Sequence, residues 1–98
     1  MSVRYTLHEI EFEWDARKAE SNLRKHGVGF EEACEVFFDP FLYALEDVGE
    51  KGEAREAVMG MMTDWRLIYV VYVERENSIR IISARSATKQ ERWQYENQ

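Results

Sequence analysis

Cysteine is scarce in this sequence: Cys34 is its only cysteine, so an internal disulfide is impossible. No cluster of cysteine and histidine suggests a metal site. No apolar run approaches the roughly 20 residues that span a membrane. The first residues also lack the apolar core of a secretion signal. We therefore predict a cytoplasmic protein with no metal, no cofactor and no membrane partner.

Basic residues are also too few for a general nucleic-acid binder. The chain has 13 Lys and Arg residues against 19 Asp and Glu, and its net charge is −6. The charge is uneven, because residues 75–98 hold five basic and three acidic side chains. The closing quarter of the chain is therefore a local basic patch on an otherwise acidic protein.

Length and composition predict a single domain over residues 1–98. Hydrophobic residues make up 45% and charged residues 33%, a balance typical of globular and not of disordered chains. A chain of 98 residues can bury one modest core between two layers. Residues 1–9 are either a poorly ordered extension or an additional strand.

Capping residues and apolar spacing predict three helices. Asp15 is an N-cap, and the helix that follows ends at Gly27 in the left-handed conformation that glycine allows. Apolar residues at helical spacing predict a second helix over residues 30–38. Thr88, with Glu91 three residues later, has the spacing of a capping box and opens a C-terminal helix.

Apolar alternation and continuous apolar runs predict the strands. We expect them at residues 10–14, 41–46, 55–62, 66–74 and 79–85. The last three are joined by short links, which favours an antiparallel meander, and residues 47–53 read as a mobile loop. The predicted fold is α+β: an antiparallel sheet of four to five strands, with two N-terminal helices and a C-terminal helix.

Several short motifs follow one another along almost the whole chain. They are Phe12-Glu13-Trp14-Asp15, Lys18, Asn22-Leu23-Arg24-Lys25-His26-Gly27-Val28, Phe30-Glu31-Glu32-Ala33, Arg55, Met59-Gly60, Ile81-Ile82-Ser83-Ala84-Arg85, Glu91-Arg92 and Tyr95. Their order and spacing resemble the BrnT family, toxins of bacterial type II toxin–antitoxin systems. The acidic balance departs from this family, because an RNA-cleaving toxin is usually more basic.

The resemblance implies a RelE-like fold and a ribonuclease that halts translation and growth. It also implies a cognate BrnA-like antitoxin with a ribbon-helix-helix DNA-binding part. Toxin and antitoxin would form a hetero-oligomer that represses its own operon and contacts operator DNA only through the antitoxin.

Cleaving RNA without a metal needs a base, an acid and cations at the phosphorus. Arg85 is the leading cation, since it ends a strand and a guanidinium can grip a phosphate at two points; a salt bridge is the alternative. Arg80 lies five residues earlier, which in a regular strand places it on the opposite face. Either Arg80 is structural, or a bulge brings the two arginines to one face.

The remaining candidates each have a structural alternative. His26 is a candidate acid or base, but a histidine in the last turn of a helix also favours the helix dipole without any catalytic purpose. Lys25, Lys89 and Arg92 either bind RNA phosphates or lie on solvated faces. Tyr95 either stacks on a base or covers sheet surface.

Three functions are compatible with these sequence features. The leading one is a metal-independent endoribonuclease toxin that acts on RNA and is neutralised by its antitoxin. The second is a non-catalytic subunit that binds the same kind of partner and serves as a co-repressor. The third, a plain RNA-binding domain, is disfavoured by the net charge of −6.

Overall fold

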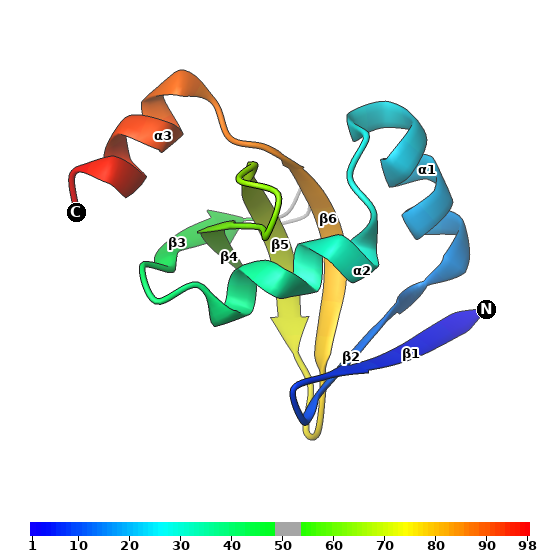
Figure 1. Ribbon diagram of the computed structural model, residues 1–98. Coiled ribbons are helices and arrows are strands. Elements are labelled where there is room, and N and C mark those ends of the chain that lie inside the picture. Colours follow the sequence, from blue (N-terminus) through cyan, green and yellow to red (C-terminus); the bar gives the residue numbers. More distant parts are fainter. Residues whose placement is uncertain (49–53) are drawn as a thin grey trace.

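The computed structural model describes residues 1–48 and 54–98, which form one six-stranded sheet with helices across and beside it (Figure 1). The strands lie in the order β1-β2-β6-β5-β4-β3. Their bounds are β1 Ser2–Leu7, β2 Ile10–Asp15, β3 Tyr43–Val48, β4 Ala54–Met61, β5 Leu67–Glu74 and β6 Ile79–Ser86. The helices are α1 Ala16–His26, α2 Phe30–Ala33, the 3-10 helix η1 Cys34–Phe38, and α3 Lys89–Glu96. The predicted α+β class and the C-terminal helix are confirmed, but four to five strands was too few for the described residues.

The additional strand is β1, at one edge of the sheet. β1 and β2 form an antiparallel hairpin in which Leu7 lies opposite Ile10. The two residues between them, His8 and Glu9, have φ values of 48° and 69°. Such a pair of left-handed residues matches the twist of a tight hairpin. Residues 2–7 are therefore an extra strand and not a disordered extension.

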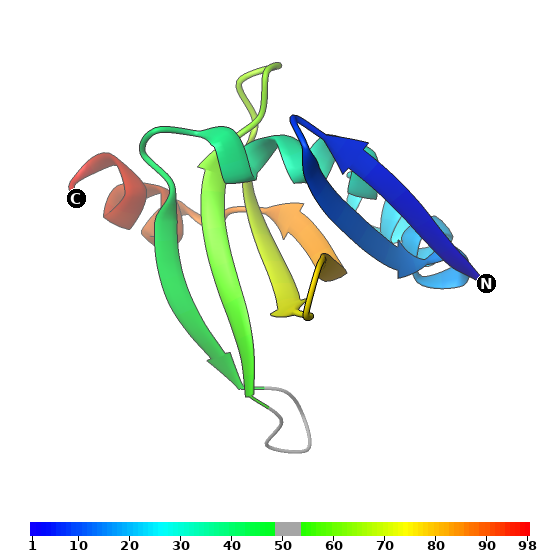
Figure 2. The same cartoon turned by 90° about the horizontal axis from the view of Figure 1, so that it is seen from below.

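The sheet is mixed, which corrects the predicted antiparallel sheet. β2 lies parallel to β6, with Phe12 opposite Ile79 and Glu13 opposite Arg80. All other neighbouring strands are antiparallel, and Figure 2 shows the strands side by side with the β1–β2 hairpin at one end. A parallel neighbour requires a long crossover, here residues 16–78. Short hairpin links can be seen in the sequence, whereas a pairing across such a crossover cannot.

The β3–β4 connection differs from the predicted loop at both ends. Asp47 and Val48 belong to β3, and β4 already begins at Ala54. The rest of the predicted mobile loop, residues 49–53, lies outside the described residues.

The predicted helix caps are confirmed. Oδ2 of Asp15 accepts a hydrogen bond of 3.1 Å from the backbone N–H of Lys18, and Gly27 ends α1 with a φ of 69°. Thr88 and Glu91 bond each other's backbone N–H groups at the start of α3.

The second predicted helix is not one regular α-helix. α2 ends at Ala33, and the chain continues as the 3-10 helix η1, a common way for an α-helix to end. This turn lays Val36 directly on β4 at Gly60. A Cβ atom at Gly60 would lie only 2.7 Å from the carbonyl oxygen of Val36.

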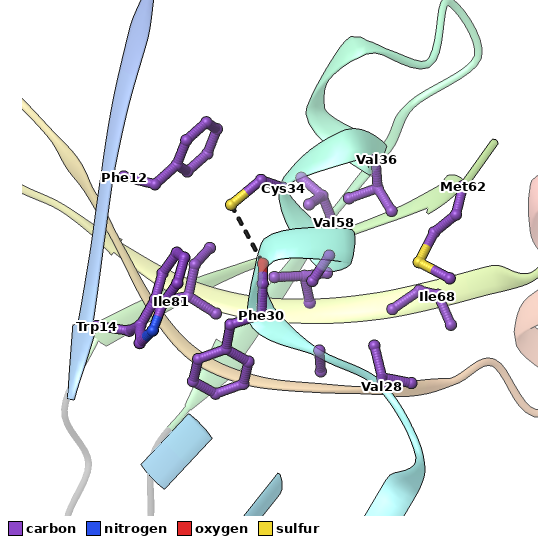
Figure 3. Packing of buried hydrophobic residues seen from close by; sticks show 13 residues of the cluster. Phe12, Trp14, Val28, Phe30, Cys34, Val36, Val58, Met62, Ile68 and Ile81 are labelled. Atoms are coloured by element: carbon purple, nitrogen blue, oxygen red, sulfur yellow. Dashed lines mark hydrogen bonds between the residues drawn. The ribbon is translucent and has the colours of Figure 1, made fainter. Parts of the chain in front are cut away.

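Side chains of the sheet are buried on both faces. On one face, under α2 and η1, Phe12, Trp14 and Phe30 belong to the larger cluster (Figure 3). On the second face the buried residues are Ala57, Met59, Leu67, Tyr69 and Val71. The second face also carries Arg80 and Arg85, which lie opposite Val73 and Tyr69.

No helix among the described residues is both long and apolar enough to cross a membrane.

Candidate functional site

Arg85 lies on the second face of the sheet, opposite Tyr69 of β5. Its guanidinium carbon is 4.1 Å from the centroid of the Tyr69 ring, a cation–π contact. Glu91 of α3 accepts two parallel hydrogen bonds from the same guanidinium, at 2.8 and 2.9 Å. The end of β6 and the start of α3 therefore fix the orientation of this cation.

The Arg85–Glu91 pair is partly open to solvent. The side chain of Arg85 is 36% exposed and that of Glu91 is 18% exposed. Hydrogen bonds from Arg85 lower the pKa of Glu91, although burial acts in the opposite direction. Glu91 is thus held ionised in the two-point geometry in which a guanidinium also binds a phosphate.

A bulge brings Arg80 to the same face as Arg85. Tyr69 lies opposite Arg85 and Val73 opposite Arg80, while the register shifts between Val71 and Tyr72. Tyr69 and Val73 are four residues apart and share a face, so their partners share it too. The extra residue on β6 is Ile82, since Val71 pairs with Ser83 and Tyr72 with Ile81. The structure therefore contains the bulge that was one of the two alternatives.

Arg80 is nevertheless bound elsewhere. Its guanidinium donates to Glu13 of β2 at 3.0 Å, and the two side chains are only 22% and 12% exposed. Ser78 donates to the other oxygen of Glu13 at 2.8 Å. This hydrogen bond and the charge of Arg80 lower the pKa of Glu13 against the effect of burial. This ion pair joins β2 to β6 where the two strands are parallel neighbours. In the structure, Arg80 therefore links these two strands.

Asn22 joins α1 to β6, a role that sequence reasoning missed. Its Nδ2 donates to the carbonyl oxygens of Ala84 and Val28, at 2.8 and 3.1 Å, and its Oδ1 accepts from the N–H of Ala84 at 3.1 Å. β2 pairs with β6 only near Ile79 and Arg80. Further along the same edge of β6, the amide of Asn22 takes the place of a neighbouring strand and bonds the backbone N–H and C=O of Ala84. An asparagine in mid-helix, where it is a poor helix former, was the available signal.

Lys25 and His26 lie at a pocket between α1 and β6. The pocket has a volume of about 220 Å³, and its lining is Lys18, Ser21, Asn22, Lys25, His26, Ile82 and Ser83. Ser83 lies on the same face as Arg85, because their partners Val71 and Tyr69 both belong to the second cluster. Of these lining residues, Lys25 and His26 are the two that the sequence predicted as site residues.

The three candidates on α3 are not brought together. Lys89 is exposed, and Arg92 pairs with Glu96 on the same helix at 3.6 Å. The hydroxyl of Tyr95 donates to Asp39, which links α3 to the turn before β3. Burial and this hydrogen bond raise the pKa of Tyr95 to about 12. Tyr95 is placed here as a structural contact.

No metal centre is evident in the described part of the chain: no three His, Cys, Asp or Glu side chains there lie close enough together to hold an ion. The thiol of Cys34 is buried and donates to the carbonyl oxygen of Phe30 at 3.2 Å (Figure 3). Burial, with a smaller contribution from Glu31, raises its pKa to about 12. Cys34 therefore acts as a small apolar residue.

The site thus consists of a mixed sheet, an arginine held in place near the end of β6, and the basic helix α1 beside that strand. The profile of the family described as ribonuclease toxin, BrnT, of type II toxin–antitoxin system matches residues 14–91. No curated protein sequence matches the chain.

A solved structure is also similar. The 1.1 Å crystal structure of the Brucella abortus ribonuclease toxin BrnT has 26% sequence identity and a TM-score of 0.58. The match covers 78% of this chain and 94% of the Brucella chain. The fold and the site thus define a toxin of the type II toxin–antitoxin class. The chain belongs to the BrnT family of ribonuclease toxins.

Proposed function

We propose that this toxin is an endoribonuclease that cleaves RNA without a metal ion and thereby stops translation and growth. The observation that carries the proposal is the preset guanidinium of Arg85, held over Tyr69 and gripped at two points by a carboxylate. A group oriented in this way can stabilise charge as it develops on a phosphate, without reorganising during the reaction.

The chemistry proposed is attack by the 2′-hydroxyl of the RNA on its own phosphate. The bond from phosphorus to the 5′-oxygen breaks, and the products carry a 2′,3′-cyclic phosphate and a free 5′-hydroxyl. Arg85 stabilises the charge on the phosphate oxygens. The 2′-hydroxyl must lose its proton and the leaving 5′-oxygen must gain one. His26, which lines the same pocket as Ser83, is proposed as the acid or base for one of these two transfers.

Binding of RNA at Arg85 requires that Glu91 give up the guanidinium. The side chain of Arg85 is 36% exposed although Glu91 holds its guanidinium at two points, so an incoming phosphate can reach it. A phosphate can therefore replace the carboxylate in the same two-point geometry.

The test uses purified toxin with an RNA substrate, and it compares Arg85→Ala with Arg4→Ala. Arg4 is a matched control, since it is also an arginine paired with a glutamate, Glu11 at 3.7 Å, but lies on the edge strand β1 and is not a site candidate. Loss of a preorganised electrostatic group costs about 2.7–4 kcal/mol of transition-state stabilisation, a 100- to 1,000-fold loss of rate. We expect this loss for Arg85→Ala and little change for Arg4→Ala. Equal cleavage by two folded variants would exclude Arg85 as the catalytic cation.

Analysis of the RNA ends tests the chemistry separately. We expect 2′,3′-cyclic phosphate and 5′-hydroxyl ends, no cleavage of DNA, and a rate that EDTA leaves unchanged. A 5′-phosphate product, or activity lost in EDTA and restored by magnesium, contradicts the mechanism.

A second function, a non-catalytic co-repressor subunit, is favoured by one observation: Glu91 already occupies the guanidinium fork of Arg85. In both functions the proposed partner is a BrnA-like ribbon-helix-helix antitoxin that brings carboxylates to the basic surface, and the complex represses its operon. If the toxin binds antitoxin and operator DNA through it, yet cleaves no RNA at any protein concentration, the second function holds.

A further inference from the structure

The pocket between α1 and β6 is lined by three basic side chains and two hydroxyls. Lys18, Ser21 and Lys25 follow one another at i, i+3 and i+7 on α1, so they share the face that meets β6. His26 lies at the end of the same helix, and Ser83 completes the pocket from the strand. No carboxylate is among these lining residues.

The basic residues of this pocket differ from most others in the protein. Within the described part of the chain, six arginines lie within 4.0 Å of a carboxylate: Arg4, Arg24, Arg66, Arg80, Arg85 and Arg92. Lys18, Lys25 and His26 have no such partner among the described residues. In an acidic protein with a net charge of −6, a concave site that is lined by basic side chains and by no carboxylate selects an anionic ligand.

We propose that this pocket binds a phosphate group of the RNA backbone beside the one held at Arg85, an assignment that rests on the proposed function. Lys18 and Lys25 supply charge, and the hydroxyls of Ser21 and Ser83 donate hydrogen bonds. Ser83 and Arg85 are two residues apart on one face of β6, a rise of about 6.6 Å along a strand. A single-stranded RNA lying along β6 can place successive phosphates at the two positions.

The composition of the pocket indicates a phosphate subsite and not a base-binding site. Base recognition in single-stranded RNA relies on stacking against aromatic or guanidinium planes. His26, at the end of α1, is the single ring among the lining side chains, which include no phenylalanine, tyrosine, tryptophan or arginine, and Ile82 is the apolar wall. The site therefore reads the backbone charge and carries no base specificity.

The first experiment uses inorganic phosphate and the two histidines of the chain as reporters. His26 lines the pocket, whereas His8 packs against Phe38, 4.9 Å between ring centroids, and lines a different cavity. At constant pH and ionic strength, phosphate should shift the ring NMR signals of His26 in a saturable way and leave those of His8 unchanged. If chloride at the same ionic strength has the same effect, or if both rings move together, the pocket does not bind phosphate.

The second experiment distinguishes an RNA phosphate from a free anion by comparing Lys18→Gln with Arg17→Gln. Both variants remove one positive charge from the first turn of α1, but Arg17 is not among the lining residues. Both keep the backbone N–H, including the one that Lys18 donates to Asp15. Only Lys18→Gln should weaken binding of single-stranded RNA and reduce the slope of log affinity against log salt, by about 0.7 for one lost phosphate contact.

Steady-state cleavage separates this subsite from the proposed catalytic role of Arg85. Lys18→Gln should raise KM more than it lowers kcat, while Arg85→Ala lowers kcat. If Lys18→Gln and Arg17→Gln change the salt dependence equally, the subsite assignment is wrong even when Arg85→Ala abolishes cleavage. If RNA binds with the expected difference between the variants but is not cleaved, the subsite stands and the nuclease proposal fails.

Discussion

Replacing Asn22 by alanine should destabilise the protein strongly, because this side chain bonds three backbone groups between α1 and β6. Among the described residues, Asn22 is the only polar side chain that is buried, at 7% exposure. Alanine leaves the N–H and the carbonyl oxygen of Ala84 without this partner. A buried group that loses its hydrogen bond costs about 1–3 kcal/mol, so the loss of unfolding free energy for these two groups should be about 2–6 kcal/mol.

Urea unfolding followed by tryptophan fluorescence measures this loss. A control is Asn97→Ala, since the Asn97 amide also donates to a backbone carbonyl, that of Trp93 at 2.8 Å, but is exposed to solvent. Water can replace that bond, so the control should change stability by no more than about 0.5 kcal/mol. If the two variants lose the same free energy, the bonds of Asn22 to β6 are not what holds α1 in place.

An isosteric variant tests the direction of the hydrogen bonds. Asn22→Asp keeps the acceptor for the N–H of Ala84 but faces a carboxylate toward the carbonyl oxygens of Ala84 and Val28. The carboxylate should have a raised pKa in the folded state, so the stability of this variant falls as pH rises through that pKa. A loss that does not depend on pH would show that the side chain has left the site.

Three further changes test other parts of the fold. Gly60→Ala should cost about 1–3 kcal/mol in urea unfolding, because its Cβ would lie 2.7 Å from a backbone oxygen. Gly29→Ala should cost less, because the nearest atom there, at 3.0 Å, is a carboxylate oxygen at the end of the Glu32 side chain. Tyr95→Phe removes the hydrogen bond to Asp39 and should cost about 1 kcal/mol without abolishing RNA cleavage; a loss of cleavage would give Tyr95 a role in the site. The hydrogen bonds from Arg85 lower the pKa of Glu91 in the folded protein. The stability that this pair contributes is therefore present above the ordinary carboxylate pKa of about 4 and is lost as pH falls below it. Arg85→Ala should flatten this acid dependence of stability, and an unchanged dependence would refute the role of the Arg85–Glu91 pair.

The helix caps could be predicted from the sequence, because they depend on residues that are close together along the chain. The caps at Asp15, Gly27 and Thr88 are set by hydrogen bonds that reach only three or four residues along the chain. The parallel pairing of β2 with β6 was not predicted, because hydrophobic alternation identifies a strand but not its distant partner. The additional strand β1 was left open for the same reason, since a terminal strand is fixed by what it packs against.

The candidate site could be predicted only in part. The position of Arg85 near the end of a strand could be predicted, because strand and helix signals meet there, but its carboxylate partner depends on where α3 turns back. The shared face of Arg80 and Arg85 depends on a bulge at Ile82, which shifts side-chain alternation by one residue. Lys18 and Ser83, which line the proposed phosphate pocket, could not be paired from the sequence, because they meet only after α1 has docked beside β6.

The hydrogen bonds between Asn22 and Ala84 join residues that are 62 positions apart. Contacts at such separation form late, because the intervening chain must be ordered before they stabilise anything. A nascent chain that has exposed only α1 carries Lys18 and His26 but has no β6 to complete the pocket. At a synthesis rate of about 5–20 residues per second, the missing strand follows within seconds. Under the proposed function, a ribosome that is making this toxin is therefore not exposed to its activity until the last strand of the sheet has been added.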